Sequence, residues 1–250
     1  MAISIFFNLI GKLSLPARLS RKDILLTIIP TLIWMGAHLS RPYILKTPCL
    51  ENGAICSESN LPSVDRLVVH LDNENANKWS TWTQNASGAI AAVVPIGLQI
   101  ARIATGFVSP VGALAAIGVD LGLLIETTLW NGAIMESFRV LVQRPRPFVY
   151  RDPIGAAGAP AHYTSFYSGH TSFAAAAMTA LLLILISRGA SPLWTVPVAT
   201  SAFIMTFFTG FFRVWAGKHF ITDVVTGAIA GFLVALTIAL VHRPKLSDRN

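Results

Sequence analysis

The sequence predicts an all-α membrane protein: a bundle of six transmembrane helices built by a single domain over residues 1–250. Of its residues, 53% are hydrophobic and only 12% are charged, about half the charged share of a usual soluble domain. The apolar residues also gather in runs of about 20, the length that crosses the hydrocarbon core of a bilayer. Buried helices of soluble proteins seldom stay apolar over such lengths, which argues against the alternative of a soluble helical protein.

Six apolar runs predict the transmembrane helices. In chain order they cover about residues 24–39, 86–107, 112–139, 170–187, 194–212 and 221–241. A polar outer loop over residues 40–84 separates the first two. Within that loop, the segment VDRLVVHL has the periodicity of a short amphipathic helix, with Val64, Leu67, Val68 and Leu71 on one face.

The charge distribution predicts the orientation in the membrane. The chain carries 19 Lys and Arg against 12 Asp and Glu, a net charge of +7. Both ends are basic, so the positive-inside rule places both termini in the cytoplasm and turns loops 40–84, 140–169 and 213–220 outward. Residues 1–22 are too short an apolar segment to span and predict an interfacial helix. Arginines placed between apolar runs suit lipid head groups or phosphate substrates, and we expect no nucleic-acid partner.

Two further features concern packing and the outer loop. Gly118 with Gly122, and Gly227 with Gly231, have the spacing that lets helix backbones approach closely in lipid. Cys49 and Cys56 both lie in the outer loop. In an oxidising compartment they can form a disulfide, and otherwise they are two small unpaired residues.

Polar residues of the types needed for phosphate chemistry occur in three stretches at the outer ends of predicted spans. A folded bundle can therefore bring them together. The stretches are RVLVQRPRPF with Arg139, Arg144 and Arg146, YSGHTSF with Ser168, Gly169 and His170, and RVWAGKHFITD with Arg213, His219 and Asp223.

These residue types indicate a site for metal-free phosphoryl transfer. Arginine binds phosphate oxygens through paired hydrogen bonds, and backbone N–H groups at Ser168 and Gly169, before a helix start, suit the same anion. His219 and Asp223 share one helix face, so the carboxylate can fix one imidazole nitrogen and leave the other nucleophilic. His170 suits a general acid.

Other polar residues have plainer interpretations. Arg144, Arg151 and Lys218 can each be head-group anchors. Asp120 and Glu126 lie inside the third span, where we expect pairing with Arg102 or a neighbouring polar group rather than a part in the site.

The three stretches resemble the motifs of the type 2 phosphatidic acid phosphatase superfamily, which are Lys-x6-Arg-Pro, Pro-Ser-Gly-His and Ser-Arg-x5-His-x3-Asp. Arg139 and Arg146 stand at the first spacing, Ser168-Gly169-His170 match the second motif, and Arg213, His219 and Asp223 match the third. The chain departs from the pattern at three positions: Arg139 replaces lysine, Tyr167 replaces proline and Phe212 replaces serine.

The resemblance implies a role for each matching residue. His219 would attack phosphorus, Asp223 would orient it, and His170 would protonate the leaving oxygen. The residues that would bind the phosphoryl oxygens are Arg139, Arg146, Ser168, Gly169 and Arg213. No metal or cofactor is implied.

The expected function is hydrolysis of a lipid phosphate or diphosphate at the outer membrane face. Candidate substrates are phosphatidate-like lipids, phosphatidylglycerol phosphate, polyprenyl diphosphate and glycolipid phosphates. A lipid phosphotransferase using the same phosphohistidine is the nearest alternative, and an inactive lipid-binding or transport protein is a third. We expect an integral protein of a bacterial inner membrane, with its site facing the periplasm or cell exterior; the oligomeric state stays open.

Overall fold

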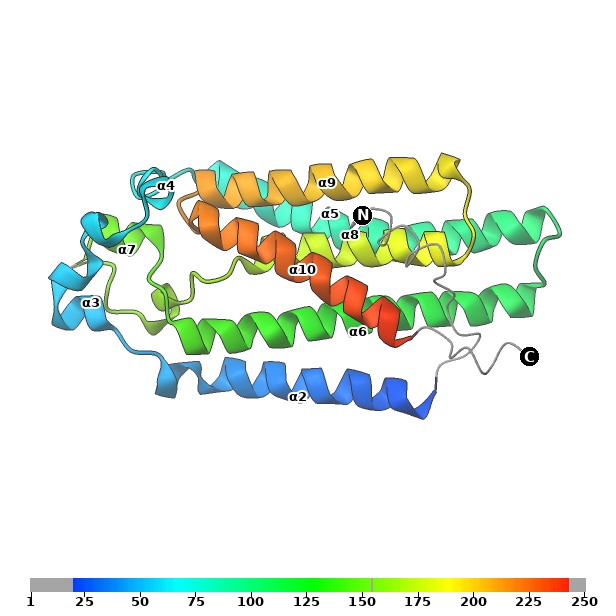
Figure 1. Ribbon diagram of the computed structural model, residues 1–250, viewed down its shortest axis with the longest axis horizontal. Helices are drawn as coiled ribbons and strands as arrows, with labels where there is room; N and C mark the ends of the chain where they lie inside the picture. Colours follow the sequence, from blue (N-terminus) through cyan, green and yellow to red (C-terminus); the bar gives the residue numbers. More distant parts are fainter. Residues whose placement is uncertain (1–19, 154, 243–250) are drawn as a thin grey trace, which may run out of the picture.

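The computed structural model describes residues 20–153 and 155–242, and over those residues the chain forms helices and turns with no strand. Its long helices are α2 (Arg21–Ile44), α5 (Glu74–Ala104), α6 (Pro110–Val142), α8 (Gly169–Ser187), α9 (Pro192–Trp215) and α10 (Ile221–Val241). All six are long and apolar enough to cross a membrane, and they run along one elongated bundle (Figure 1). The predicted all-α fold with six spans is confirmed. Most of the predicted interfacial helix and the basic tail lie outside the described residues.

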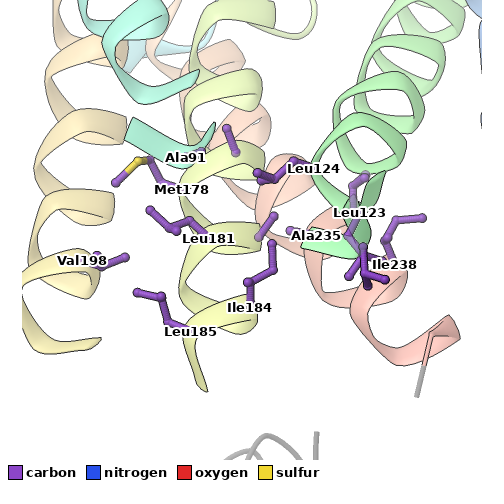
Figure 2. Close-up of a cluster of buried hydrophobic side chains, with 14 of the residues drawn as sticks. Ala91, Leu123, Leu124, Met178, Leu181, Ile184, Leu185, Val198, Ala235 and Ile238 are labelled. Carbon is purple, nitrogen blue, oxygen red and sulfur yellow. The ribbon is translucent and has the colours of Figure 1, made fainter. Parts of the chain in front are cut away.

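Helix α8 forms the centre of the bundle. It packs against α5, α6, α9 and α10, whereas α2 packs chiefly against α6. Figure 2 shows Met178, Leu181 and Leu185 of α8 reaching into the cluster of apolar side chains shared by these helices. The outer helices instead turn large apolar side chains away from the protein, among them Leu32 and Phe203, as lipid-facing helices do.

Helices α8 and α10 approach closely because α10 carries glycine where they meet. A Cβ atom at Gly227 would lie 2.7 Å from the Ser168 carbonyl oxygen, and one at Gly231 would collide with the Ser172 carbonyl. The prediction from the second glycine pair is therefore confirmed. Gly118 has no atom within 4 Å of its Cβ position, so the prediction of a close approach there is wrong.

The outer loop is shorter than predicted, because α5 begins at Glu74 rather than near residue 86. The Asn73 side chain accepts a hydrogen bond from the Ala76 amide at 2.9 Å and caps the helix there. The remaining connection, loop 45–73, contains α3 (Pro48–Glu51), η1 (Gly53–Cys56), η2 (Glu58–Asn60) and α4 (Ser63–Arg66). It covers one end of the bundle, which we call the loop end (Figure 1).

The amphipathic helix predicted in that loop forms only in part. Helix α4 ends at Arg66, and the buried side chains beyond it are the adjacent Val68 and Val69, which pack with Phe220. Leu67 of the predicted apolar face is exposed. The predicted face is wrong because the helix ends after four residues and residues 67–70 form a turn. In a turn, adjacent residues such as Val68 and Val69 can both be buried.

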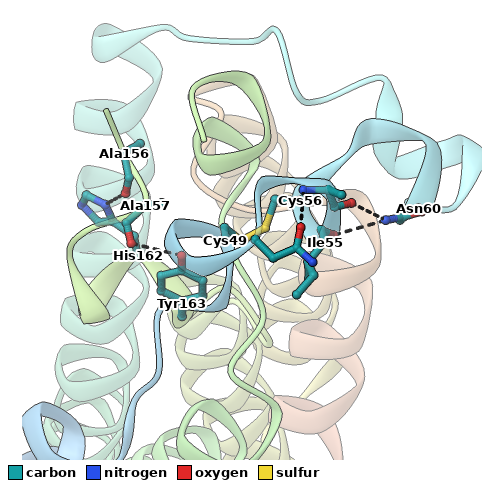
Figure 3. The surroundings of a disulfide bond; sticks show 10 residues. Cys49, Ile55, Cys56, Asn60, Ala156, Ala157, His162 and Tyr163 are labelled. Atoms are coloured by element: carbon teal, nitrogen blue, oxygen red, sulfur yellow. Dashed lines mark hydrogen bonds between the residues drawn. A yellow bond between two sulfur atoms is a disulfide. The ribbon is translucent and has the colours of Figure 1, made fainter. Parts of the chain in front are cut away.

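A disulfide joins Cys49 to Cys56 and is buried under the segment between α6 and α8 (Figure 3). That segment includes α7 (Pro147–Arg151) and η3 (Pro160–Tyr163). The cysteines pack against Val149 and Tyr163, and the Tyr163 hydroxyl donates to the Ala157 carbonyl at 3.0 Å. The disulfide thereby anchors loop 45–73 on the segment that leads into α8.

Asp120 and Glu126, two of the three acidic residues within α6, pair with residues at the ends of neighbouring helices. Arg188 donates to Asp120 Oδ1 at 2.7 Å, so Asp120 has Arg188 as its direct partner. Glu126 Oε2 lies 3.1 Å from Nε2 of His242. Arg102 instead lies over the ring of Phe107, 4.6 Å from its centroid.

Candidate active site

A cavity of about 470 Å³ opens at the loop end, and six of the eight predicted site residues line it. They come from the last turns of α6 and α9, the residue before α7, the first turn of α8 and the connection between α9 and α10. In chain order they are Arg139, Arg146, Gly169, His170, Arg213 and His219. The three stretches predicted to converge do meet around one cavity, while Ser168 and Asp223 are buried behind its wall.

Three guanidinium groups surround the cavity and are held by partners on different elements. Arg213 donates to Asn77 Oδ1 of α5 at 2.7 Å. Arg146 donates to Thr164 Oγ1 at 3.3 Å, and Arg139 lies 3.8 Å from the carboxylate of Glu136. Each of the three keeps a buried Nε–H group without a partner among the described residues. Buried cations with free donors around one cavity form a binding site for an anion such as phosphate.

His219 is presented to this cavity as a neutral imidazole. Its Nδ1 donates to the Ser165 carbonyl at 2.7 Å, so Nε2 carries the lone pair. Within the described structure Nε2 is buried without a hydrogen-bond partner. Burial, followed by the charges of Arg213, Arg146 and Arg139, lowers the pKa of His219 well below its ordinary value. The imidazole is therefore unprotonated at neutral pH and can act as a nucleophile.

Asp223 does not make the direct hydrogen bond to His219 that the spacing predicts. Its Oδ2 lies 3.7 Å from Nδ1, beyond hydrogen-bonding distance. That oxygen instead accepts from the Ser165 hydroxyl at 2.6 Å and from the Phe220 amide at 3.0 Å, because Asp223 also caps the start of α10. The carboxylate thus holds Ser165, and the Ser165 carbonyl holds the imidazole.

The turn into α8 differs in part from expectation. The Ser168 amide donates to the Asp223 backbone carbonyl at 3.1 Å, and its hydroxyl pairs with Thr171 Oγ1 at 2.9 Å. The amide is therefore engaged within the protein, whereas the hydroxyl has one partner and keeps further hydrogen-bonding capacity. Gly169 does line the cavity, and a Cβ there would lie 2.8 Å from Nη2 of Arg139. His170 lines it as well, with Nε2 3.5 Å from Thr81 Oγ1.

Arg144 belongs to the site's supporting structure, where sequence reasoning allowed a head-group anchor. It donates to Asp223 Oδ1 at 2.5 Å and to Asp65 Oδ2 at 2.7 Å. Asp65, a fully buried residue of loop 45–73, also accepts from the Thr222 amide at 3.1 Å. No sequence signal identifies Asp65 or Ser165, because their partners lie on distant segments. Arg151 likewise pairs with Asp72 of the loop, and Lys218 lies over the Phe148 ring.

The rest of the cavity wall is mostly apolar. Trp34 of α2, Leu129 and Met135 of α6 and Phe173 of α8 line it beyond the arginines. The cavity therefore combines cations that suit an anion with an apolar surface that suits a hydrocarbon group, and Gln84, Thr128 and Asn131 also line it. Among the described residues, the one group of three side chains that could hold a metal ion is Asp23, Glu126 and His242, which is not part of this cavity.

Comparison with known proteins agrees with the motifs. No curated protein and no solved structure matches the chain. The family model of the PAP2 superfamily matches residues 120–246, which include all eight site residues predicted from the sequence. PAP2 proteins are generally phosphatases that act on phosphate esters, often those of lipids. The chain belongs to the PAP2 superfamily and is an integral membrane protein of that family.

Proposed function

We propose that this protein hydrolyses the phosphate or diphosphate head group of a membrane lipid through a phosphohistidine intermediate. The observation that carries the proposal is the free Nε2 of a neutral His219, which faces the same cavity as Arg139, Arg146 and Arg213. The arginines bind the phosphoryl oxygens and stabilise the charge that develops on them in the transition state.

The reaction proceeds in two displacements at phosphorus. In the first, His219 Nε2 forms a bond to phosphorus while the bond from phosphorus to the lipid oxygen breaks. His170, which takes up a proton when the bound phosphoryl group offsets the charge of the arginines, gives that proton to the leaving oxygen. In the second, His170 takes a proton from water, the water oxygen bonds to phosphorus, and the N–P bond breaks to release phosphate. Asp223 keeps His219 oriented through Ser165.

The apolar part of the cavity supports a lipid substrate. Trp34, Leu129 and Phe173 give the cavity a hydrocarbon surface in addition to its arginines. The four lipid classes expected from the sequence share an anionic head on an apolar tail, and all of them fit this division. The basic N-terminal segment and tail support a loop end that faces outward, which in a bacterial inner membrane is the periplasm or cell exterior. Residues 1–250 act as one domain in this proposal.

The test of the nucleophile is His219→Ala assayed by phosphate release from a panel of lipid phosphates. We expect kcat to fall by at least about 10³-fold, because no other group replaces the attacking nitrogen. His70→Ala is the matched control, since His70 is an exposed histidine of loop 45–73 that pairs with Glu58 at 3.1 Å. Unchanged turnover in His219→Ala, with the protein folded and inserted, would refute the assignment.

The same assay separates the two alternatives. Hydrolysis requires that the wild-type protein release inorganic phosphate with no acceptor lipid present. A phosphotransferase would release none under those conditions and would transfer the group once a second lipid is added. An inactive lipid-binding or transport protein would do neither.

A further inference from the structure

A second polar cluster lies away from the candidate active site, toward the other end of the bundle (Figure 1). It consists of Asp23 in the first turn of α2, Glu126 in α6 and His242 just after α10, and all three side chains are buried. Glu126 lies thirteen positions before Arg139 on α6, about 20 Å along a helix at 1.5 Å per residue. The cluster is therefore distinct from the catalytic cavity, and the proposed reaction makes no use of it.

The three side chains converge on one point. His242 Nε2 lies 2.9 Å from Asp23 Oδ1 and 3.1 Å from Glu126 Oε2, and the three ligating atoms all lie within 4.8 Å of one another. His242 Nδ1 contacts the Ile238 carbonyl at 2.9 Å. With the proton on Nδ1, this N–H donates to the carbonyl and leaves Nε2 as the ligating atom, as is usual for metal-binding histidines. The Ser20 amide holds the other oxygen of Asp23.

The three side chains of the cluster do not balance their own charge, and among the described residues none of the ion pairs brings them an arginine or lysine. Two carboxylates and one imidazole carry a net charge of −1 even when the imidazole is protonated, and an uncompensated charge is costly inside a membrane protein. Glu126 Oε2 is fully buried and makes no hydrogen bond of ordinary geometry to any described residue, although it points at His242. Lys22 follows Arg21 at the start of α2, next to Asp23 in the chain, but its ammonium is exposed and donates to the Val241 carbonyl at 3.2 Å. A divalent cation with a neutral imidazole brings the net charge of the cluster to zero.

We propose that Asp23, Glu126 and His242 bind one divalent transition-metal ion of the Zn²⁺ class. Zinc bonds to imidazole nitrogen and carboxylate oxygen at about 2.0–2.2 Å, which places tetrahedral ligand atoms about 3.3–3.5 Å apart. The two separations from His242 Nε2, 2.9 and 3.1 Å, need widen by only a few tenths of an ångström, and the two carboxylate oxygens, which lie within 4.8 Å of each other, would settle at the same spacing. The imidazole ligand favours zinc over magnesium or calcium, which take oxygen ligands.

Such an ion would fasten α2 to the bundle. Helix α2 packs chiefly against α6 and is the least buried of the six long helices, yet it supplies Trp34 to the catalytic cavity. Ligands from α2, α6 and the end of α10 would join three elements at one point. The role is structural, so the proposal does not depend on the proposed phosphatase chemistry.

The test is Zn²⁺ binding to the full-length protein in detergent, after removal of metal with a chelator. We expect one Zn²⁺ per chain by elemental analysis, with an affinity measured in competition with a chromophoric chelator. Glu126→Gln and His242→Gln are expected to weaken binding by at least about 100-fold. His70→Gln is the matched control, because His70 and Glu58 form an exposed pair at 3.1 Å with no third ligand.

A second measurement covers variants that fold poorly. Zinc well above its Kd is expected to raise the Tm of the wild-type protein and to leave that of Glu126→Gln unchanged. X-ray absorption on the loaded wild-type protein should report nitrogen and oxygen ligands with an imidazole among them. A wild-type protein that binds no more zinc than Glu126→Gln would overturn the proposal and identify the cluster as a buried ion triad with a protonated His242.

Discussion

The Ser165 carbonyl fixes the tautomer of His219, and the Asp223 carboxylate in turn fixes the Ser165 hydroxyl. Sequence spacing identified both His219 and Asp223 because both stand in one short motif. It missed Ser165, since the direction of a backbone carbonyl in an irregular segment leaves no local pattern. Tyr167, which stands where the family has proline, is likewise explained only by packing: its buried ring lies 5.8 Å from that of Phe138.

The arginines around His219 should set its protonation. Arg146→Met removes one of the positive charges that disfavour the imidazolium, so the pKa of His219 is expected to rise. The neutral nucleophile would then be lost at a higher pH than in the wild-type protein, and the acid limb of kcat/KM should move upward in pH. Histidine NMR of the substrate-free protein measures the pKa directly.

The matched variant for that experiment is Arg151→Met. Arg151 is an arginine of the same segment, but it pairs with Asp72 of loop 45–73 and does not line the cavity. We expect the His219 titration to stay at its wild-type position in this variant. A fall in the His219 pKa in Arg146→Met, or no change, would contradict the electrostatic account.

At the scale of the helices, the contact between α8 and α10 brings the second motif, at the start of α8, next to the third motif, at the start of α10. Gly227 and Gly231 bring the α10 backbone against α8, next to the bond from the Ser168 amide to the Asp223 carbonyl. The sequence contains the same glycine spacing at Gly118, where the structure has no close neighbour. Spacing alone therefore shows where a close approach is possible, while the partner helix decides whether it occurs.

Gly231→Leu tests the importance of this contact. A side chain there would force α10 away from the Ser172 carbonyl, and overpacking of this kind costs about 1–3 kcal/mol. We expect a lower Tm in detergent together with reduced turnover. Gly118→Leu, at an exposed position on α6, should leave both quantities near wild type. Equal losses in the two variants would argue against a special role for the α8–α10 contact.

At the scale of the whole molecule, loop 45–73 and the bundle form one structure. The spans could be predicted from the sequence because the partition of side chains between water and lipid is a local property. The docking of the loop could not, because it depends on pairs such as Asp65 with Arg144, which are 79 residues apart. The loop also extends the candidate site beyond the region that the family model matches.

Asp65→Asn is expected to weaken both the fold and the site. It removes a buried carboxylate from Arg144, and breaking such a pair costs about 3–5 kcal/mol. We expect kcat to fall with little change in KM, because Asp65 acts through Arg144 on Asp223 and does not touch the cavity. Thermal unfolding and steady-state kinetics measure the two effects.

The chain provides its own control for this variant. Asp72 and Arg151 also lie 79 residues apart and also meet at 2.7 Å, but their pair is exposed. Asp72→Asn should therefore change stability by no more than about 1 kcal/mol. If both substitutions gave the same small change, the Asp65–Arg144 pair would not couple loop 45–73 to the stability of the bundle.

The partners of Arg213 have a consequence for how the family can diversify. The region matched by the family model carries the candidate chemistry, but the α5 residues Asn77 and Ser80 that bind this guanidinium lie in the other half of the chain, as does Trp34 of the cavity wall. Under the proposed function, a change in that first half would alter the fit of the lipid tail without replacing the residues assigned to the phosphate chemistry. A chimera that exchanges residues 21–104 should thus carry substrate preference with it, provided that the donor helix again offers an acceptor to Arg213.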